Sequence, residues 1–192
     1  MRVNRVATSL VFLLLIAAAP STRPTLPRDI RDLANTSHRL LAGKATVLFF
    51  VGTECPVSNG YVPEMNRIAE AYAGQGIACY AVYAGADVTA AAAGKHAKEF
   101  AIALPAVIDP KCELADAVGA TTTIEAAVVL ADGSLAYRGR VDDTYVAFGR
   151  KKLVVLQHDV RDVLDDVVAG RRINPRTTTA VGCLIVRPEK KR

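Results

Sequence analysis

The sequence of 192 residues contains no tryptophan and only three histidines, and no two of its four cysteines are spaced as Cys-x-x-Cys. Zinc sites of the common structural kind depend on such cysteine pairs, so the sequence gives no support for one. The formal net charge is only +5, and the basic residues form no stripe interleaved with aromatic residues. This pattern argues against a nucleic-acid-binding protein.

Long apolar runs are also scarce, and the most extended one stands near the first residue. Arg2 and Arg5 precede an apolar stretch from about Val6 to Ala19, which is shorter than the roughly 20 residues that span a bilayer. A short charged segment followed by a short apolar one is typical of a signal peptide. We therefore expect residues 1–19 to direct export to the periplasm or the extracellular space, with no stable membrane insertion after cleavage. A retained anchor is the alternative.

The rest of the chain has the composition of one globular domain, since 51% of all residues are hydrophobic and 22% are charged. Residues 20–35 begin with a proline-rich stretch that has no periodicity, and they are predicted to be a linker. Residues 36–192 are long enough for one domain with its own core and a C-terminal extension. Disulfides persist in exported proteins, and the sequence alone leaves the pairing of the four cysteines open.

Apolar periodicity predicts alternating strands and helices. Two continuous apolar runs, Ala45 to Val51 and Gly76 to Ala84, predict strands buried on both faces, and residues Tyr61 to Tyr72 between them have helical spacing. The other expected elements are a helix at 87–100, a short strand and helix within 104–120, a hairpin around Asp132-Gly133, a helix at 158–170 and a strand-like segment at 180–187. This order predicts an α/β sandwich with a mixed central sheet.

Cys55 stands where the first predicted strand ends and the first predicted helix begins. A helix N-terminus presents free N–H groups and a partial positive charge, which favour a thiolate over a thiol. The edge where strands end is also where open α/β sheets usually bind ligands. The adjacent Glu54 opposes ionisation if its side chain points at the sulfur. The position predicts a reactive thiol.

The run "VLFFVGTECPVSNGYVPEMNRIAEAY" resembles the thioredoxin-like redoxin superfamily, and more narrowly a branch of exported bacterial redoxin-domain proteins. That branch carries an E/D-C-P-x-S-N motif followed by a Pro-Glu helix. The segments "YAGADVTAAAAGKHAKEF", "YRGRVDDTYVAFG" and "TTAVGCLI" fit it too, so the resemblance extends from about Thr36 to Val186. It implies a thioredoxin-like three-layer sandwich and an activity as a disulfide reductase, a peroxidase or a metal chaperone.

Three positions depart from the better-characterised relatives. Ser58 stands where a thioredoxin has its second motif cysteine, so Cys55 has no partner within the motif. Gly52 holds the place of the peroxiredoxin threonine, which argues against a typical peroxidase. Thr123-Ile124 replaces the pair that includes the cis-proline of the substrate-binding loop. A cis bond before isoleucine costs about 2.5–4 kcal/mol, so we expect this bond to be trans and the substrate-binding edge to be altered.

A lone thiolate that forms a mixed disulfide needs a second thiol for release. Cys79 lies in a predicted buried strand and is expected in the core, and Cys112 begins a short helix and is expected to be structural. Cys183 lies in a C-terminal segment that the resemblance includes, and we select it as the residue that approaches Cys55 and can bridge to it. The pair would act on protein or small-molecule thiols and disulfides, with no cofactor.

Other polar residues have weaker claims. Ser58 and Asn59 are expected to cap or line the first turn of the helix, where they could hydrogen-bond the Cys55 sulfur. His96 is expected on the surface of its helix, and His158 is expected to have a capping or surface role.

Asp142 and Asp143 are expected in a turn or linked to Arg140. Two alternative functions remain at this point. One is a copper-binding module with Cys55, Cys183 and His158 as ligands, since thiolates favour Cu(I). The other is a redoxin-like domain that binds another exported protein without chemistry.

Overall fold

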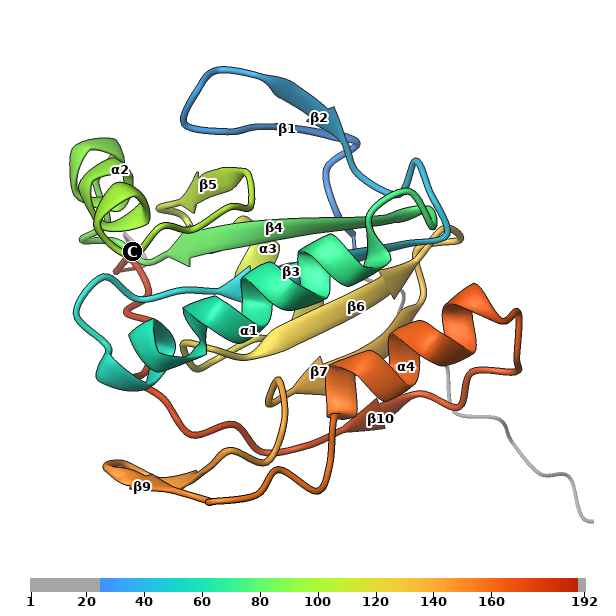
Figure 1. Cartoon of the computed structure of the whole chain (residues 1–192). Coiled ribbons are helices and arrows are strands. Elements are labelled where there is room, and N and C mark those ends of the chain that lie inside the picture. Colours follow the sequence, from blue (N-terminus) through green and yellow to red (C-terminus); the bar gives the residue numbers. More distant parts are fainter. Residues whose placement is uncertain (1–24, 190–192) are drawn as a thin grey trace, which may run out of the picture.

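The computed structural model describes residues 25–189 of the chain. The predicted signal peptide, 1–19, lies outside these residues, as does the first part of the predicted linker. A six-stranded sheet with the order β10-β7-β6-β3-β4-β5 forms the centre, and two separate two-stranded ribbons flank it (Figure 1). The elements are β1 (Asp29–Arg31), β2 (Ser37–Arg39), β3 (Ala45–Phe50), α1 (Pro56–Tyr72), β4 (Ile77–Ala84), α2 (Ala90–Glu99), β5 (Ala106–Asp109), α3 (Glu113–Val118), β6 (Ala126–Leu130), β7 (Leu135–Gly139), β8 (Tyr145–Ala147), β9 (Arg150–Lys151), α4 (Asp159–Val168) and β10 (Arg176–Thr177).

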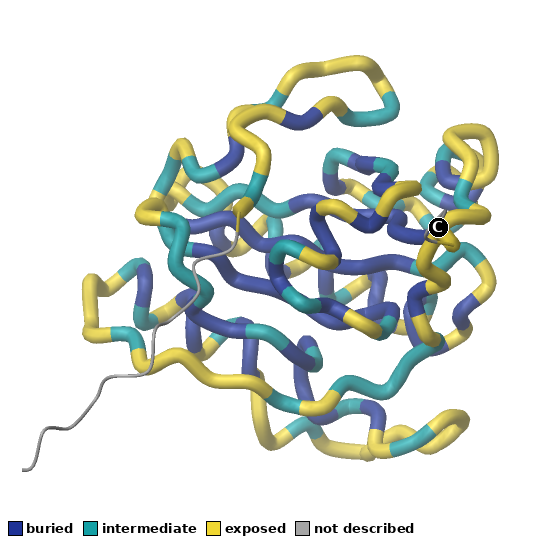
Figure 2. The backbone as a smooth tube through the Cα atoms, turned by 180° about the vertical axis from the view of Figure 1, so that it is seen from behind, coloured by how far each residue is buried: buried dark blue, intermediate teal, exposed yellow. Residues whose placement is uncertain are grey.

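Strand β3 lies inside the sheet and is buried along its whole length. It pairs in parallel with β4 and antiparallel with β6, which makes the sheet mixed, as the sequence predicts. Successive side chains of a strand point to opposite faces. Phe49 accordingly packs with α1 and α4 on one face, whereas Phe50 packs with α3 and the N-terminal residues Ile30 and Leu40 on the other. Figure 2 shows the buried strands enclosed by exposed loops.

The N-terminus of helix α1 lies at the carboxyl end of β3. Pro56 occupies the first helical turn, where its missing N–H costs no intrahelical hydrogen bond. The buried face of α1 includes Tyr61, Met65 and Ile68, so the predicted helical face is confirmed.

The predicted hairpin is also confirmed, because β6 and β7 pair antiparallel around Gly133, whose φ of 82° suits a glycine.

The prediction of a strand over residues 180–187 is wrong, because this segment forms no regular strand. Within the described residues, this segment makes one isolated antiparallel bridge, between Thr122 and Leu184. The strand that extends the sheet on this side is instead β10, which pairs in parallel with β7. After β10 the segment therefore leaves the sheet and runs to the N-terminus of α1, where Cys55 lies.

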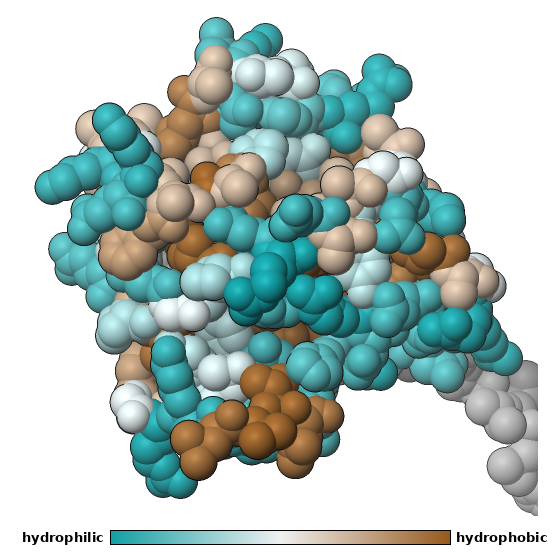
Figure 3. All heavy atoms as spheres, in the orientation of Figure 1, coloured by the Kyte–Doolittle hydropathy of each residue, from teal (hydrophilic) through white to brown (hydrophobic). Residues whose placement is uncertain are grey.

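Strands β8 and β9 form a ribbon beside the first turns of α1, where Tyr145 packs against Tyr61, and the sequence pattern does not predict it. The ribbon and the loop that follows expose apolar side chains, which gather at the lower edge of the face shown in Figure 3. These residues are Val146, Phe148, Leu153, Val154 and Leu156. No helix within residues 25–189 is long and apolar enough to cross a membrane.

Candidate redox site

Cys55 is the N-cap of α1, with an extended backbone conformation (φ −87°, ψ 110°). Only 2% of its surface is exposed. The adjacent Glu54 is exposed. The structure thus places the predicted thiol at the predicted helix N-terminus, but beneath the surface.

The loop from Thr123 to Glu125 runs alongside the end of β3. The backbone N–H of Ile124 donates to the carbonyl of Phe50, and the N–H of Phe50 donates to the carbonyl of Glu125. The described chain has no cis peptide bond, so the bond before Ile124 is trans, as predicted. Ile124 has a φ of 62°, a left-handed conformation that is uncommon for a β-branched residue. Strain of this kind is held in place by surrounding contacts and is frequent at functional sites.

Thr123 holds the C-terminal segment against Cys55. The N–H of Thr123 donates to the carbonyl of Cys183 at 2.7 Å, and the Thr123 hydroxyl accepts from the N–H of Cys183 at 3.0 Å. The same hydroxyl hydrogen-bonds the Cys55 sulfur. One residue therefore fixes the backbone of one cysteine and contacts the thiol of the other. The sequence predicts that Thr123 and Ile124 belong to a substrate-binding loop, and that role stays a prediction.

Cys183 packs against the buried cluster that contains Cys55, and both are free thiols. Cys183 is only partly buried, whereas its neighbours Leu184 and Val186 expose 78% and 56% of their surfaces. Next along the chain from Leu184, Ile185 is buried, and its N–H donates to the carbonyl of Thr121. The structure brings together the two cysteines that the sequence analysis selected.

The two thiols of the pair have pKa values shifted in opposite directions. Burial raises the pKa of Cys55, but hydrogen bonds from Thr123, the backbone N–H of Ser58 and Cys183 outweigh it, so the pKa lies below the ordinary value of 9.0. Burial and the neighbouring Cys55 thiolate raise the pKa of Cys183. Burial also raises the pKa of Cys112, and that of Cys79 to about 12. Of the four thiols, only Cys55 is held in a site that favours the thiolate.

Gly182 is required by the close approach of the C-terminal segment to the Thr123 loop. A Cβ atom at this position would lie 1.9 Å from the carbonyl oxygen of Thr123. A side chain at residue 182 would therefore push the two backbones apart, and Cys183 would move with them. The Gly-Cys string of the sequence thus has a steric reason.

Ser58 and Asn59 differ from expectation. The Ser58 hydroxyl accepts from the N–H of Gly52 at 3.2 Å, and the backbone N–H of Ser58, not its side chain, faces the Cys55 sulfur. The predicted contact of the Asn59 side chain with this sulfur is wrong, because its Oδ1 pairs with Nε2 of His96 at 2.8 Å. Asn59 supports the packing of α2 on α1.

The expected surface position of His96 is also wrong. His96 is 4% exposed, and its Nδ1 is 2.9 Å from the Tyr83 hydroxyl. With a proton on Nε2, the ring donates to Asn59 and accepts from Tyr83, so both nitrogens are paired in the neutral form. Burial accordingly lowers the pKa of His96.

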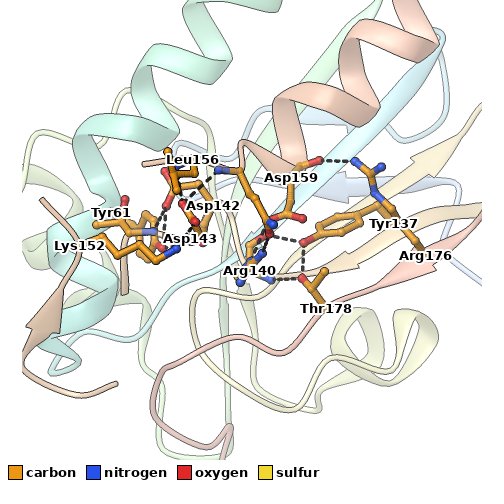
Figure 4. A network of polar contacts seen from close by, with 12 residues as sticks. Tyr61, Tyr137, Arg140, Asp142, Asp143, Lys152, Leu156, Asp159, Arg176 and Thr178 are labelled. Carbon is orange, nitrogen blue, oxygen red and sulfur yellow. Dashed lines mark hydrogen bonds and ion pairs between the residues drawn. The ribbon is translucent and has the colours of Figure 1, made fainter. Parts of the chain in front are cut away.

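The two neighbouring carboxylates hold the β8–β9 ribbon (Figure 4). Asp142 accepts from the Tyr61 hydroxyl at 2.9 Å. Asp143 pairs with Lys152 and accepts from the N–H of Leu156 at 2.9 Å. Both residues are buried in the turn before β8, which agrees with the predicted turn position, and they connect α1 to the ribbon.

The expected link from these carboxylates to Arg140 is not formed. Arg140 instead pairs with Asp159 at the start of α4, with 2.8 Å between Nε and Oδ2 (Figure 4). His158 precedes Asp159, is exposed, and makes no side-chain cap of the helix. Residues 25–189 contain no group of three or more His, Cys, Asp or Glu side chains that could hold a metal ion. The copper site proposed from Cys55, Cys183 and His158 is therefore not assembled.

The Redoxin family model matches residues 17–148, more than half of the sequence, so this chain belongs to the Redoxin family. The match contains Cys55 and Thr123 and ends before Cys183. A search of curated proteins found no significant match.

Solved structures confirm the fold. A hypothetical protein from Sinorhizobium meliloti 1021 is 22% identical, with 91% of this chain and 97% of that chain covered and a TM-score of 0.74. An uncharacterized conserved protein from Geobacillus kaustophilus is also 22% identical, with 91% and 96% covered and a TM-score of 0.77. MTB dsbF is 17% identical, with 80% and 98% covered and a TM-score of 0.51. The fold is a thioredoxin-like α/β sandwich, as predicted.

Proposed function

We propose that this chain is an exported thiol–disulfide oxidoreductase in which Cys55 and Cys183 form the redox pair. The observation that carries the proposal is the position of Cys183, which two backbone hydrogen bonds to Thr123 hold against the buried cluster that contains Cys55. The pKa of Cys55 is lowered at this position. Membership of the Redoxin family supports the same chemistry. A disulfide between the two residues requires their Cβ atoms to lie about 3.5–4.5 Å apart.

The reaction is an exchange of two electrons and two protons. The two thiols are oxidised to one disulfide while an external disulfide is reduced to two thiols, and the reverse reaction makes an external disulfide. The Thr123 hydroxyl and the Ser58 N–H stabilise negative charge on the Cys55 sulfur, both when it attacks and when it leaves. The substrates are protein or small-molecule thiols and disulfides.

The proposal is tested by equilibrating the reduced protein with glutathione and glutathione disulfide, followed by non-reducing peptide mapping. We expect one disulfide, Cys55–Cys183, and loss of insulin reduction in both Cys55→Ser and Cys183→Ser. Cys79→Ser is the matched control, because Cys79 lies in strand β4, outside the redox pair, and its pKa of about 12 leaves it protonated. A wild-type protein that neither forms this disulfide nor reduces insulin would contradict the proposal and favour a binding role without chemistry.

The export part of the proposal rests on residues 1–19. The charged start and the short apolar run have the features of a signal peptide. Expression of the full chain in a Gram-negative host should give a periplasmic protein whose N-terminus lies near residue 20. Replacing Leu13 and Leu14 by Lys should retain the uncleaved chain in the cytoplasm. Recovery of uncleaved wild-type chain from the membrane fraction would support the retained anchor instead.

A further inference from the structure

The two sulfurs of the pair differ in their access to solvent. Cys55 is 2% exposed and lies under the C-terminal segment, whereas Cys183 is part of that segment and is partly exposed. Figure 1 shows this red segment passing the amino end of α1, at the edge where β3 and β4 end. A hydrogen bond from the N–H of Ala86 to the carbonyl of Val186 fixes it there. A molecule approaching from outside therefore meets Cys183 first.

We propose that external thiols and disulfides exchange at Cys183, that Cys55 reacts only with Cys183 inside the protein, and that the partner is a polypeptide whose cysteine has apolar neighbours. The inference rests on the proposed redox pair and assigns the order of its steps. It reverses the order expected from the position of Cys55 in the E-C-P-x-S-N motif, where the motif thiol would meet the substrate.

The steps balance as follows. A substrate thiolate attacks Sγ of Cys183 in the oxidised protein, a bond forms between these sulfurs, and the Cys183–Cys55 bond breaks. Cys55 leaves as a thiolate that Thr123 and Ser58 hydrogen-bond. A second substrate thiolate then attacks the substrate sulfur of the mixed disulfide, and Cys183 leaves and takes a proton. The substrate is oxidised by two electrons and the protein is reduced by two. An external disulfide reoxidises the protein by the same steps in reverse.

The surface around Cys183 indicates the chemistry of the partner. Leu184 and Val186 expose 78% and 56% of their surfaces on either side of the buried Ile185. Apolar side chains beside a partner's cysteine can cover these residues when that cysteine reaches Cys183, so docking and exchange occur at one place. Glutathione has no apolar side chain beside its cysteine for this contact.

The test determines which of the two cysteines forms the first mixed disulfide. Oxidised wild-type protein is mixed with glutathione, quenched with acid within milliseconds to seconds, and mapped by mass spectrometry. We expect glutathione on Cys183 and a free thiol at Cys55. Reduced Cys55→Ser treated with glutathione disulfide should form a stable adduct at Cys183 about tenfold faster than Cys183→Ser forms one at Cys55, because exchange requires access to the sulfur and Cys55 is only 2% exposed.

The outcomes separate the two proposals. If the oxidised protein has no Cys55–Cys183 disulfide, both proposals are overturned. If the disulfide forms and glutathione appears first on Cys55, only the order of steps is overturned. The quench experiment on wild-type protein uses no variant, so it decides the order even if a cysteine variant fails to fold.

The partner class is tested with two cysteine peptides, one with leucine and one with glycine on both sides of the cysteine. The leucine peptide should reduce the oxidised protein several times faster, and Leu184→Ser should remove the difference. Leu153→Ser is the matched control, because Leu153 is fully exposed but lies in the loop after β9. Equal rates for the two peptides with wild-type protein would overturn the apolar partner.

Discussion

The hydroxyl of Thr123 accepts a hydrogen bond from the backbone N–H of Cys183 at 3.0 Å while it also contacts the sulfur of Cys55. Sixty residues of sequence separate Thr123 from Cys183. The contact therefore depends on the complete fold, in which the loop before β6 and the C-terminal segment meet at the start of α1. It connects the position of the second thiol to the ionisation of the first.

Thr123→Val removes this hydroxyl with little change of shape. We expect the pKa of Cys55 to rise towards 9.0, because the lost hydrogen bond favoured the thiolate over the thiol. Thiolate absorbance at 240 nm during a pH titration of the reduced protein measures the change, with Cys55→Ser identifying the transition. Thr122→Val is the control and should leave the titration unchanged. An unaltered titration in Thr123→Val would exclude the hydroxyl as a cause of the lowered pKa.

Gly182→Ala should separate the two thiols without changing either. The added Cβ would lie 1.9 Å from a backbone oxygen of Thr123, so the segment that carries Cys183 must move. Misplacement of reacting atoms by about 1 Å can slow a reaction roughly 100-fold, and we expect formation of the Cys55–Cys183 disulfide to slow by about 10-fold to 100-fold. Gly94→Ala is the matched control, because its Cβ would meet only Leu33 Cδ1 at 3.9 Å. Equal rates in the two variants would contradict the steric role of Gly182.

Asp143→Ala should release the β8–β9 ribbon. The carboxylate pairs with Lys152, which holds the pKa of Asp143 well below its usual range, and it also accepts the N–H of Leu156. We expect trypsin to cleave near Lys152 about tenfold faster, because proteolysis follows the population of the open loop. Asp166→Ala, which removes an exposed pair with Arg171, should leave this cleavage unchanged. Unchanged cleavage in Asp143→Ala would show that other contacts hold the ribbon.

The sequence predicts the central elements of the fold because each buries an apolar face with its own period. Strand β3 is a continuous apolar run, and α1 repeats apolar residues at helical spacing. The segment that carries Cys183 is different, since backbone hydrogen bonds to Thr121 and Thr123 position it rather than a strand ladder. No local pattern reveals contacts of that kind. The approach of Cys183 to Cys55 was expected from a family resemblance, not from periodicity.

Two polar contacts were missed for different reasons. The hydrogen bond between the Thr123 hydroxyl and the Cys55 sulfur spans distant parts of the chain and leaves no local signal. The burial of His96 does leave one, because Ala93, His96 and Phe100 follow one another at spacings of three and four residues on a single helix face. Ala93 and His96 are both buried. Apart from Phe100, this face of α2 contains only small or polar residues, so hydrophobicity alone does not identify it as the buried face.

His96→Gln should reduce the pH dependence of stability in the acidic range. Burial lowers the pKa of His96 below 6.5, so between these two values the unfolded chain binds more protons than the folded one. The contribution of His96 is complete above pH 6.5 and is lost as the pH falls towards its folded pKa. Urea unfolding at pH 7.5 and pH 5.5 should therefore show a smaller loss of unfolding free energy in His96→Gln than in wild type. His158→Gln, which changes an exposed histidine, should lose as much stability as wild type. If His96→Gln and wild type lose equal free energy over this range, the buried neutral imidazole does not cause the acid sensitivity.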